Sequence, residues 1–269
     1  MANELPERSE WDGLVRNRAD PSEGPSLAVI VGAAGGSWSS PVRVTGDDTR
    51  DYFAKFPELC PNPPDRMSVV IEMVVARAGR LIGAPTCETV VMRVPAEIQG
   101  ELLKGVAITS SFVHASVALD NCDEKRPQLP DRGHDDNRRR HTTLYALYDW
   151  FMGWDQQWLR DLDDDLAVYS HDHGLYLPPV GSGYWTDGDL QSNVDTAWPL
   201  PDDAAGLLPA AISETADELR GVTRADIQSV LMQVPPSWPV TDEQLEGLGW
   251  WMERRAPAVA GRIEQLASS

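Results

Sequence analysis

Residues 166–179 read LAVYSHDHGLYLPP, with an aspartate between two histidines directly after an apolar run. The β-branched and aromatic residues before the aspartate are typical of a strand, and Gly174 after the second histidine is typical of a turn. Because adjacent side chains on a strand point to opposite faces, His171 and Asp172 are expected to face different ways. The stretch therefore predicts a strand followed by a turn that presents Asp172 alone.

A rival interpretation makes His171 and Asp172 the centre of an HD-type metal-dependent phosphohydrolase, with His134 or His141 as an upstream ligand. Such a site places the histidine and the aspartate on a helix, so that both side chains face one metal ion. The residues before the aspartate favour a strand, and the prolines that close the segment disfavour a helix. This interpretation is therefore the weaker one.

The composition is that of a soluble globular protein with 269 residues, 42% hydrophobic and 24% charged, enough for one large domain or one domain in two lobes. The net charge of −19 disfavours nucleic acid and anionic lipid as partners. No apolar run could span a membrane, and the start, MANELPERSEWDG, does not resemble a signal peptide. The three cysteines lack metal-site or disulfide spacing. These features predict a cytoplasmic protein with no nucleic acid and no membrane partner.

The first half of the chain predicts a lobe that combines strands with one buried helix. Apolar and β-branched residues cluster or alternate in the stretches expected to be strands: 26–31, 41–44, 50–56, 89–94 and 106–113. The small, polar segment 32–40, GAAGGSWSS, connects the first two strands. A helix is expected over 68–83, capped by Ser68 and closed by Gly83, with apolar residues on almost every face. Strands around a buried helix indicate an α+β lobe.

The second half predicts mostly helices. The expected elements are an amphipathic helix over 141–154, a short helix over 156–165, a strand over 166–170, a loop over 184–203, and helices to the end, the last capped by Thr241 and Gln244. The chain thus divides into a flexible tail (1–25), a strand-rich lobe (26–119), a charged linker or loop (120–140) and a helical lobe (141–269).

Lys55 and Glu72 form the first candidate pair of functional residues. Only Lys55, Lys104 and Lys125 are lysines among the 23 basic residues, so a lysine in the strand YFAKF indicates a need for a compact point charge. Glu72 lies inside the apolar helix sequence VVIEMVVA, where an unpaired carboxylate is costly. The sequence therefore predicts an ion pair between this strand and this helix.

Asp155 and Asp172 form the second candidate pair. Asp155 follows the apolar helix end DWFMGW, and Asp172 ends the strand LAVYS. In kinase-like phosphotransferases, one aspartate accepts or positions the proton of the substrate hydroxyl, and another holds magnesium against the phosphates. The order lysine, glutamate, aspartate, aspartate is typical of such enzymes.

These motifs resemble the HipA-like kinases, which are similar in turn to phosphatidylinositol 4-kinase-type domains. The segment RDYFAKF…SVVIEMVVARAGRLIGAPTCETVVMRVPAEI is similar to the family's ATP-lysine strand, glutamate helix and following strand. The segment LYDWFMGWDQQWL…VYSHDHGLYLP resembles its catalytic loop and metal-binding Asp-His-Gly. The resemblance covers residues 27–180, with a looser match in the closing helices.

The resemblance implies a bilobal, protein-kinase-like α+β fold with a strand-rich, nucleotide-binding N-lobe and a helical C-lobe. It implies transfer of the γ-phosphate of ATP, with Mg²⁺, to a hydroxyl of a protein serine or threonine or of a small molecule. The implied roles are Asp155 as the catalytic residue, Asp172 and Gln157 as metal ligands, and Lys55, Glu72, Gly35, Gly36, Ser37, Ser39 and Ser110 in the nucleotide site.

Two positions depart from the family pattern. Family members usually show Asn-x-Asp and then an asparagine five residues on as a second metal ligand, whereas this chain has Gly153 and Arg160 there. This departure motivates a further alternative, a catalytically inactive kinase-like module that binds nucleotide or a partner protein.

Overall fold

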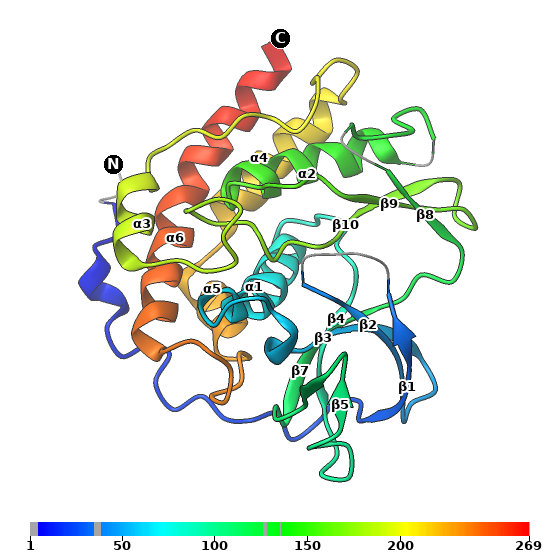
Figure 1. Cartoon of the computed structure of the whole chain (residues 1–269). Coiled ribbons are helices and arrows are strands. Elements are labelled where there is room, and N and C mark those ends of the chain that lie inside the picture. Colours follow the sequence, from blue (N-terminus) through cyan, green and yellow to red (C-terminus); the bar gives the residue numbers. More distant parts are fainter. Residues whose placement is uncertain (1–4, 35–38, 126–127, 135, 269) are drawn as a thin grey trace.

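Strands dominate the first half of the chain and helices dominate the second half (Figure 1). The computed structural model describes residues 5–34, 39–125, 128–134 and 136–268. The strands are β1 Leu27–Ala33, β2 Val42–Gly46, β3 Asp51–Lys55, β4 Thr89–Arg93, β5 Leu102–Leu103, β6 Val106–Ala107, β7 Phe112–Val117, β8 Cys122–Lys125, β9 Trp158–Asp161 and β10 Ala167–Ser170. The α-helices are α1 Ser68–Leu81, α2 Asn137–Trp150, α3 Asp187–Asn193, α4 Pro209–Gly221, α5 Arg224–Leu231 and α6 Asp242–Gln265.

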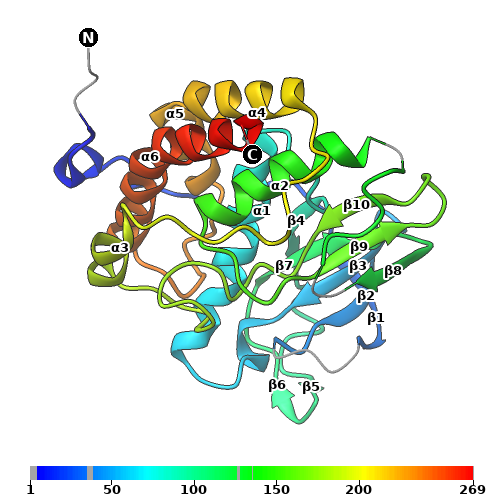
Figure 2. The ribbon, with the colours of Figure 1, turned by 90° about the horizontal axis from the view of Figure 1, so that it is seen from above.

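The main sheet has the strand order β1-β2-β3-β7-β4, and all of its pairs within the described residues are antiparallel. A second sheet, with the order β10-β9-β8, lies beside α2 and above the main sheet in Figure 1. Figure 2 shows α2, α4, α5 and α6 gathered on one side of the molecule and the strands on the other. The chain passes from the sheet-rich part to the helical part through residues 118–121, between β7 and β8.

The helix α1 connects the two parts because almost every face of it is apolar. Its sequence, SVVIEMVVARAGRL, is buried over nearly its whole length, and it packs against β4 and β7 as well as α2 and α5. Ser68 begins the helix but makes no capping bond, so the expected cap is wrong. Gly83 closes the helix as expected, with a left-handed φ of 67° that glycine adopts without strain. The helix thus forms a common core for both parts of the molecule.

Three stretches after residue 119 differ from the expected elements. Residues 156–165 contain the strand β9 instead of a short helix, because β9 pairs with β10 on one side and with β8 on the other. The strand β8 comes from the stretch 120–140 that was expected to be a linker or loop. Within the expected loop 184–203, Thr186 and Asp189 form a capping box that begins α3. The predicted capping of the last helix by Thr241 and Gln244 is confirmed.

The described part of the N-terminal segment is not a loose tail. Trp11 and Val15 are fully buried, and the indole nitrogen of Trp11 donates to Glu253 at 2.7 Å. Gly249 of α6 leaves room for the indole, since a Cβ atom there would lie 2.2 Å from the ring. The partner residues are more than 200 positions away in sequence, so no local pattern predicts this packing.

A buried ion cluster fixes α2 to α6. Asp149 near the end of α2 accepts hydrogen bonds from Arg255 at 3.1 Å and from Arg262 at 2.6 Å. Arg255 is fully buried and also donates to backbone carbonyl groups around the end of α2. No helix in the described parts of the chain has the length and apolar character needed to cross a membrane.

We predict that Trp11→Ala lowers the free energy of unfolding by about 3–5 kcal/mol, because it removes a fully buried ring and its hydrogen bond. Trp154→Ala is the matched control, because the Trp154 side chain is 49% exposed and should cost less than about 1 kcal/mol. Urea unfolding followed by far-ultraviolet circular dichroism measures both. A loss of less than about 1 kcal/mol for Trp11→Ala would show that the packing of the N-terminal segment contributes little to the stability of the fold.

We also predict a pH effect that originates at His141 in α2. This side chain is fully buried, and burial together with the charge of Arg132 lowers the pKa of His141 from 6.5 to about 4. Between pH 6.5 and about pH 4, His141 binds a proton in the unfolded chain but not in the folded one. The free energy of unfolding therefore decreases as the pH falls below 6.5. When the pH is lowered from 7 to 5, the free energy of unfolding of the wild type should decrease by about 2 kcal/mol more than that of His141→Gln.

The measurement is urea unfolding at pH 7, 6 and 5. His134→Gln controls for the loss of an imidazole, since the His134 side chain is 52% exposed. The prediction fails if wild type and His141→Gln lose stability in parallel.

Candidate active site

A cavity of about 340 Å³ lies between the main sheet and the helical part. Its walls come from both sheets, from α1 and from the loop after β10. The lining residues are Ala34, Pro41, Phe53, Lys55, Glu72, Ala76, Cys87, Thr89, His114, Ser116, Val117, Leu119, Cys122, Glu124, Gln157, Leu159, Ser170, His171, Asp172 and His173. The volume falls in the range of small-molecule sites.

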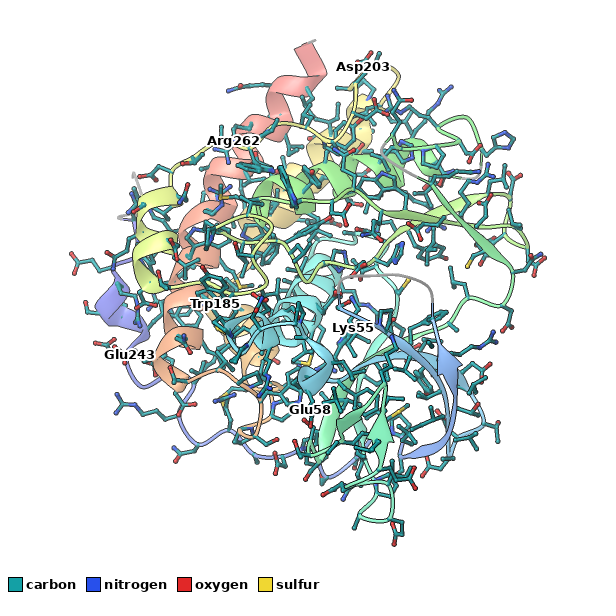
Figure 3. All side chains as sticks on the ribbon, in the orientation of Figure 1. Lys55, Glu58, Trp185, Asp203, Glu243 and Arg262 are labelled. Atoms are coloured by element: carbon teal, nitrogen blue, oxygen red, sulfur yellow. The ribbon has the colours of Figure 1, made fainter. Side chains whose placement is uncertain are left out.

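Lys55 is at the centre of this cavity because of the alternation of β3. Tyr52 and Ala54 point into the apolar core of the sheet, so Phe53 and Lys55 point to the opposite face, into the cavity. The amine of Lys55 contacts the carboxylates of both Glu72 and Asp172, and Figure 3 labels it beside α1. The predicted ion pair between Lys55 and Glu72 is therefore confirmed, and Asp172 joins it.

Glu72 also holds the loop that carries Asp172. Its carboxylate accepts the backbone N–H of His173 at 2.9 Å and of Gly174 at 2.8 Å. A Cβ atom at position 174 would lie 2.9 Å from the Glu72 carboxylate, so the close approach requires glycine. One buried carboxylate thus fixes both Lys55 and the Asp172 loop.

Burial and the neighbouring opposite charges shift the pKa values of these three groups in opposite directions. Burial lowers the pKa of Lys55, but the charges of Asp172 and Glu72 outweigh it and raise that pKa above its ordinary value. Burial raises the pKa of Glu72, and Lys55 only partly opposes this. Burial also raises the pKa of Asp172, but the attraction of Lys55 outweighs it and holds the pKa of Asp172 below its ordinary value. The amine and the Asp172 carboxylate are therefore both charged at neutral pH.

The histidines beside Asp172 differ in their surroundings. His173 is buried, its Nε2 lies 2.8 Å from the Ser170 hydroxyl, and its ring packs edge-on against Tyr176. Burial lowers the pKa of His173 to about 3, so the ring is neutral. His171 lines the cavity together with Asp172, contrary to the expected opposite orientation. The reason is that β10 ends at Ser170 and Asp172 has a left-handed φ of 56°, so strand alternation no longer applies.

The geometry of an HD-type metal site is not found. His171 and Asp172 lie in a loop after a strand rather than on a helix. His134 is exposed and lies 3.6 Å from Asp165, while His141 accepts a hydrogen bond from Arg132 at 3.2 Å. Among the described residues, no group of three or more histidine, cysteine, aspartate or glutamate side chains could hold a metal ion.

Asp155 lies one hydrogen bond away from the cavity wall. The turn after α2 is tight, and a Cβ atom at Gly153 would meet the Tyr148 ring at 2.2 Å. Asp155 is exposed, with a left-handed φ of 47°, and accepts a 2.7 Å hydrogen bond from the Gln157 amide nitrogen. Gln157 is itself buried and lines the cavity. The turn therefore links a solvent-facing carboxylate to the cavity.

Arg160, which stands where the resemblance requires an asparagine, does not line the cavity. It lies in β9 and donates to Asp123 of β8 at 2.7 Å and to Asp131 at 2.9 Å. These bonds tie the second sheet to the segment before α2. Arg160 therefore stabilises the contact between β9, β8 and the segment before α2 and does not face the cavity.

The predicted residues of the nucleotide wall are only partly in place. Gly35, Gly36 and Ser37 lie outside the described residues. Ser39 is buried and does not line the cavity, although Ala34 and Pro41 on either side of this connection do.

Ser110, a predicted residue of the nucleotide site, is not among the described residues that line the cavity. Its backbone N–H donates to Glu58, in a turn that precedes β7. Figure 3 labels Glu58 below Lys55. The physical reason is that β7 starts only at Phe112, so the turn lies at the end of the strand remote from residues 118–121.

The part of the cavity wall that β7 forms was not predicted from the sequence. His114 and Ser116 face the cavity, and Val117 and Leu119 follow them along the wall. The alternation of FVHASV carried the signal, but the expected strand 106–113 ended too early to reveal which side chains share a face.

Comparison with known proteins identifies the fold. No protein-family model matches this sequence, and no curated protein matches it in sequence. The structure is similar to that of CtkA, a proinflammatory kinase of Helicobacter pylori, with a TM-score of 0.56 and 13% identity over 90% of this chain and 96% of that one. It is also similar to the Golgi casein kinase, with a TM-score of 0.50 and 11% identity over 98% of this chain and 78% of that one.

The predicted fold class is therefore confirmed. The chain has a kinase-like α+β fold with a sheet-rich part and a helical part. The narrower resemblance to HipA-like kinases rests on the sequence motifs alone.

We predict that Lys55 and Glu72 are strongly coupled in stability. Lys55→Met leaves the buried carboxylate of Glu72 and the partly buried carboxylate of Asp172 without a cation and should cost about 3–5 kcal/mol of unfolding free energy. Glu72→Gln in the same chain removes one of those charges and should restore about 1–3 kcal/mol. Urea unfolding of the wild type, both single variants and the double variant gives the coupling energy.

The exposed pair Arg50 and Glu88 is the matched control, with side chains 46% and 44% exposed and a contact of 2.8 Å. The cycle Arg50→Met and Glu88→Gln should give at most about 0.5 kcal/mol of coupling. Additive losses at Lys55 and Glu72 would contradict the ion pair.

Proposed function

We propose that this chain is an ATP-dependent phosphotransferase that moves the γ-phosphate of ATP to a hydroxyl group, and that it is a HipA-like kinase acting on serine or threonine of a protein. The observation that carries the proposal is the contact of one buried lysine, Lys55, with both Glu72 and Asp172 in the cavity between the sheet and the helices. This combination corresponds to the lysine, the orienting glutamate and the metal-binding aspartate of kinase sites.

The cavity divides into an apolar region and a charged region that suit the two halves of a nucleotide. Phe53, Leu119 and Leu159 form the apolar walls for a base. Lys55 lies in the charged region, where its positive charge would bind phosphate oxygens. Glu72 would keep the amine in place, since its carboxylate is already fixed by two backbone N–H groups.

The donor atoms around Asp172 fit magnesium. Mg²⁺ prefers oxygen ligands and is usually bound by one or two carboxylates together with substrate phosphates and waters. Asp172 would supply the carboxylate and Gln157 an amide oxygen, because the Gln157 nitrogen is used on Asp155. When bound, the ion neutralises negative charge on the phosphate groups.

Asp155 is the residue that would accept the proton of the acceptor hydroxyl. Its carboxylate is exposed, so an acceptor from solution can reach it, and the Gln157 amide orients it. The net charge of −19 favours neutral or basic protein acceptors over nucleic acid or anionic membranes. A small-molecule hydroxyl is the other acceptor compatible with an open site, and a cytoplasmic location with access to ATP is part of the proposal.

One observation favours a second candidate, an inactive kinase-like module that binds nucleotide or a partner protein. Arg160 occupies the position of the second metal-ligand asparagine and is held by Asp123 and Asp131, away from the cavity lining. Such a module would keep the cavity but would not turn over ATP.

We predict that Asp172→Asn lowers magnesium-dependent ATP turnover by about 100-fold or more, because the amide no longer neutralises the cation at the phosphates. His171→Ala, one residue away in the same loop, removes another side chain of the cavity wall but keeps the Asp172 carboxylate, so it should have a smaller effect. The assay measures ADP formation and transfer of labelled γ-phosphate to a mixture of serine- and threonine-containing peptides. Unfolding midpoints establish that both variants fold.

Each alternative has its own outcome. Equal and complete loss in both variants, with free phosphate released, would refute the kinase assignment in favour of a hydrolase. An inactive module would show no turnover in any variant, while ADP would still raise the melting temperature of the wild type.

A further inference from the structure

The turn that carries Asp155 also presents a tryptophan to solvent. Trp154, the residue before Asp155, is 49% exposed, more than any other tryptophan in the parts of the chain that the structure describes. A tryptophan ring contributes strongly to stability when it is buried, and this one is kept outside. Single exposed apolar residues are ordinary in proteins, so the case for a role depends on how the ring is held.

The backbone around Trp154 is held in an uncommon conformation. Met152 and Asp155 have left-handed φ values of 52° and 47°, a region that residues with a side chain rarely adopt. The carbonyl group of Gly153, between them, accepts a 2.8 Å hydrogen bond from the indole of Trp198. Such conformations persist only where the surrounding structure fixes them, and they are common at functional sites. The turn therefore fixes the direction in which Trp154 leaves the backbone.

One edge of the indole rests on the loop that follows Asp172. A Cβ atom at Gly181 would lie 3.2 Å from Nε1 of Trp154, and Gly181 has a left-handed φ of 85°. Glycine suits this position both by its φ and by its small size. The ring is thus supported by a second segment, while it stays half exposed beside the exposed carboxylate of Asp155.

The surroundings of Trp154 favour a positively charged partner. The face of an aromatic ring attracts cations, and that of tryptophan does so most strongly. The chain uses this contact internally, since the guanidinium group of Arg255 lies 4.7 Å from the centre of the Trp251 ring. Among the described residues, no arginine or lysine lies over Trp154 in this way. The neighbouring Asp155 and the net charge of −19 add to the attraction.

We propose that Trp154 determines acceptor specificity by binding an arginine or lysine of the acceptor protein, close in sequence to the serine or threonine that is phosphorylated. The inference rests on the proposed function, in which Asp155 accepts the proton of the acceptor hydroxyl. Adjacent Cα atoms are about 3.8 Å apart, so the cation and the hydroxyl must come from nearby residues. An extended acceptor chain advances about 3.4 Å per residue, which limits their separation to about three positions.

The experiment measures phosphate transfer from ATP, with Mg²⁺, to synthetic peptides that contain one serine among alanine and glycine residues. Each of the three positions before and after the serine carries either arginine or citrulline, which has nearly the same shape but no charge. We expect arginine to raise kcat/KM about three- to tenfold over citrulline at one or two positions, as one cation–π contact would. The gain should lie in KM, because the contact is made equally before and during the transfer.

Three variants test whether Trp154 is the origin of this preference. Trp154→Phe should keep part of it and Trp154→Leu should abolish it, because a phenyl ring binds cations less strongly and an alkyl chain does not. Leu162→Ala is the matched control and should keep the full preference. It removes another exposed apolar side chain, 42% exposed, from the hairpin between β9 and β10. The melting temperature and the Kd for ADP of each variant show that it is folded with its nucleotide site intact.

The outcomes separate this inference from the proposed function. If the wild type does not turn over ATP, the proposed function fails and this inference fails with it. If ATP is turned over but arginine and citrulline peptides react equally, or no peptide is phosphorylated, only this inference is overturned. If Trp154→Leu keeps the preference of the wild type, the overall negative charge attracts the peptide and the role assigned to Trp154 is wrong.

Discussion

The structure depends on one buried cation shared by two carboxylates. Lys55 comes from β3, Glu72 from α1 and Asp172 from the loop after β10, so the contact joins the sheet, the central helix and the helical part at a single point. Burial raises the pKa of Glu72, so the charges that persist at neutral pH are those of the Lys55 amine and the Asp172 carboxylate. The Asp172 carboxylate is partly exposed, and an oxygen ligand of this kind is what the proposed divalent metal requires. The contact that joins the parts of the fold is thus also the one on which the proposed nucleotide site depends.

The surrounding sequence follows from the need to place that contact correctly. The helix α1 must be apolar on nearly all faces, because it packs on the sheet and on α2 and α5 while carrying Glu72 inside. Gly174 is required because the loop backbone approaches the Glu72 carboxylate, and Gly153 because the turn before Asp155 is pressed against Tyr148. Gln157 then couples the exposed carboxylate of Asp155 to the cavity wall. Each of these residues limits the freedom of one element that meets at the site.

The sequence predicted those features that obey a local or a charge-balance rule. A glutamate inside an apolar helix needs a cation, and the rarity of lysine pointed to Lys55, so the pair could be inferred without coordinates. The alternation of β10 and the capping box at Thr241 are likewise local. The kinase-like architecture itself required the resemblance, since strand and helix order alone fit many α+β folds.

Two of the failures involve partners distant in sequence. The strand β9 was expected to be helical, because the pairing that makes it a strand comes from β8, in a stretch with the composition of a linker. Trp11 gains its burial from α6, at the other end of the chain. Other failures are local: β7 begins only at Phe112, which leaves Ser110 in the turn before it, and β10 ends at Ser170, which turns His171 toward the cavity. Tertiary pairing decided the first two cases, and the exact ends of strands decided the others.

The N-terminal segment has a mechanical consequence. It is anchored on the helical part by Trp11 and by a 2.8 Å bond from Arg18 to Asp242, and it then joins the sheet where the Arg93 backbone N–H donates to Pro25 at 3.0 Å. The chain therefore crosses between the two parts twice, through residues 19–24 and again through residues 118–121. One short crossing would leave the two bodies free to swing and twist in several directions. Two crossings define an axis, so any opening and closing around a bound molecule is confined to rotation about the line that joins them.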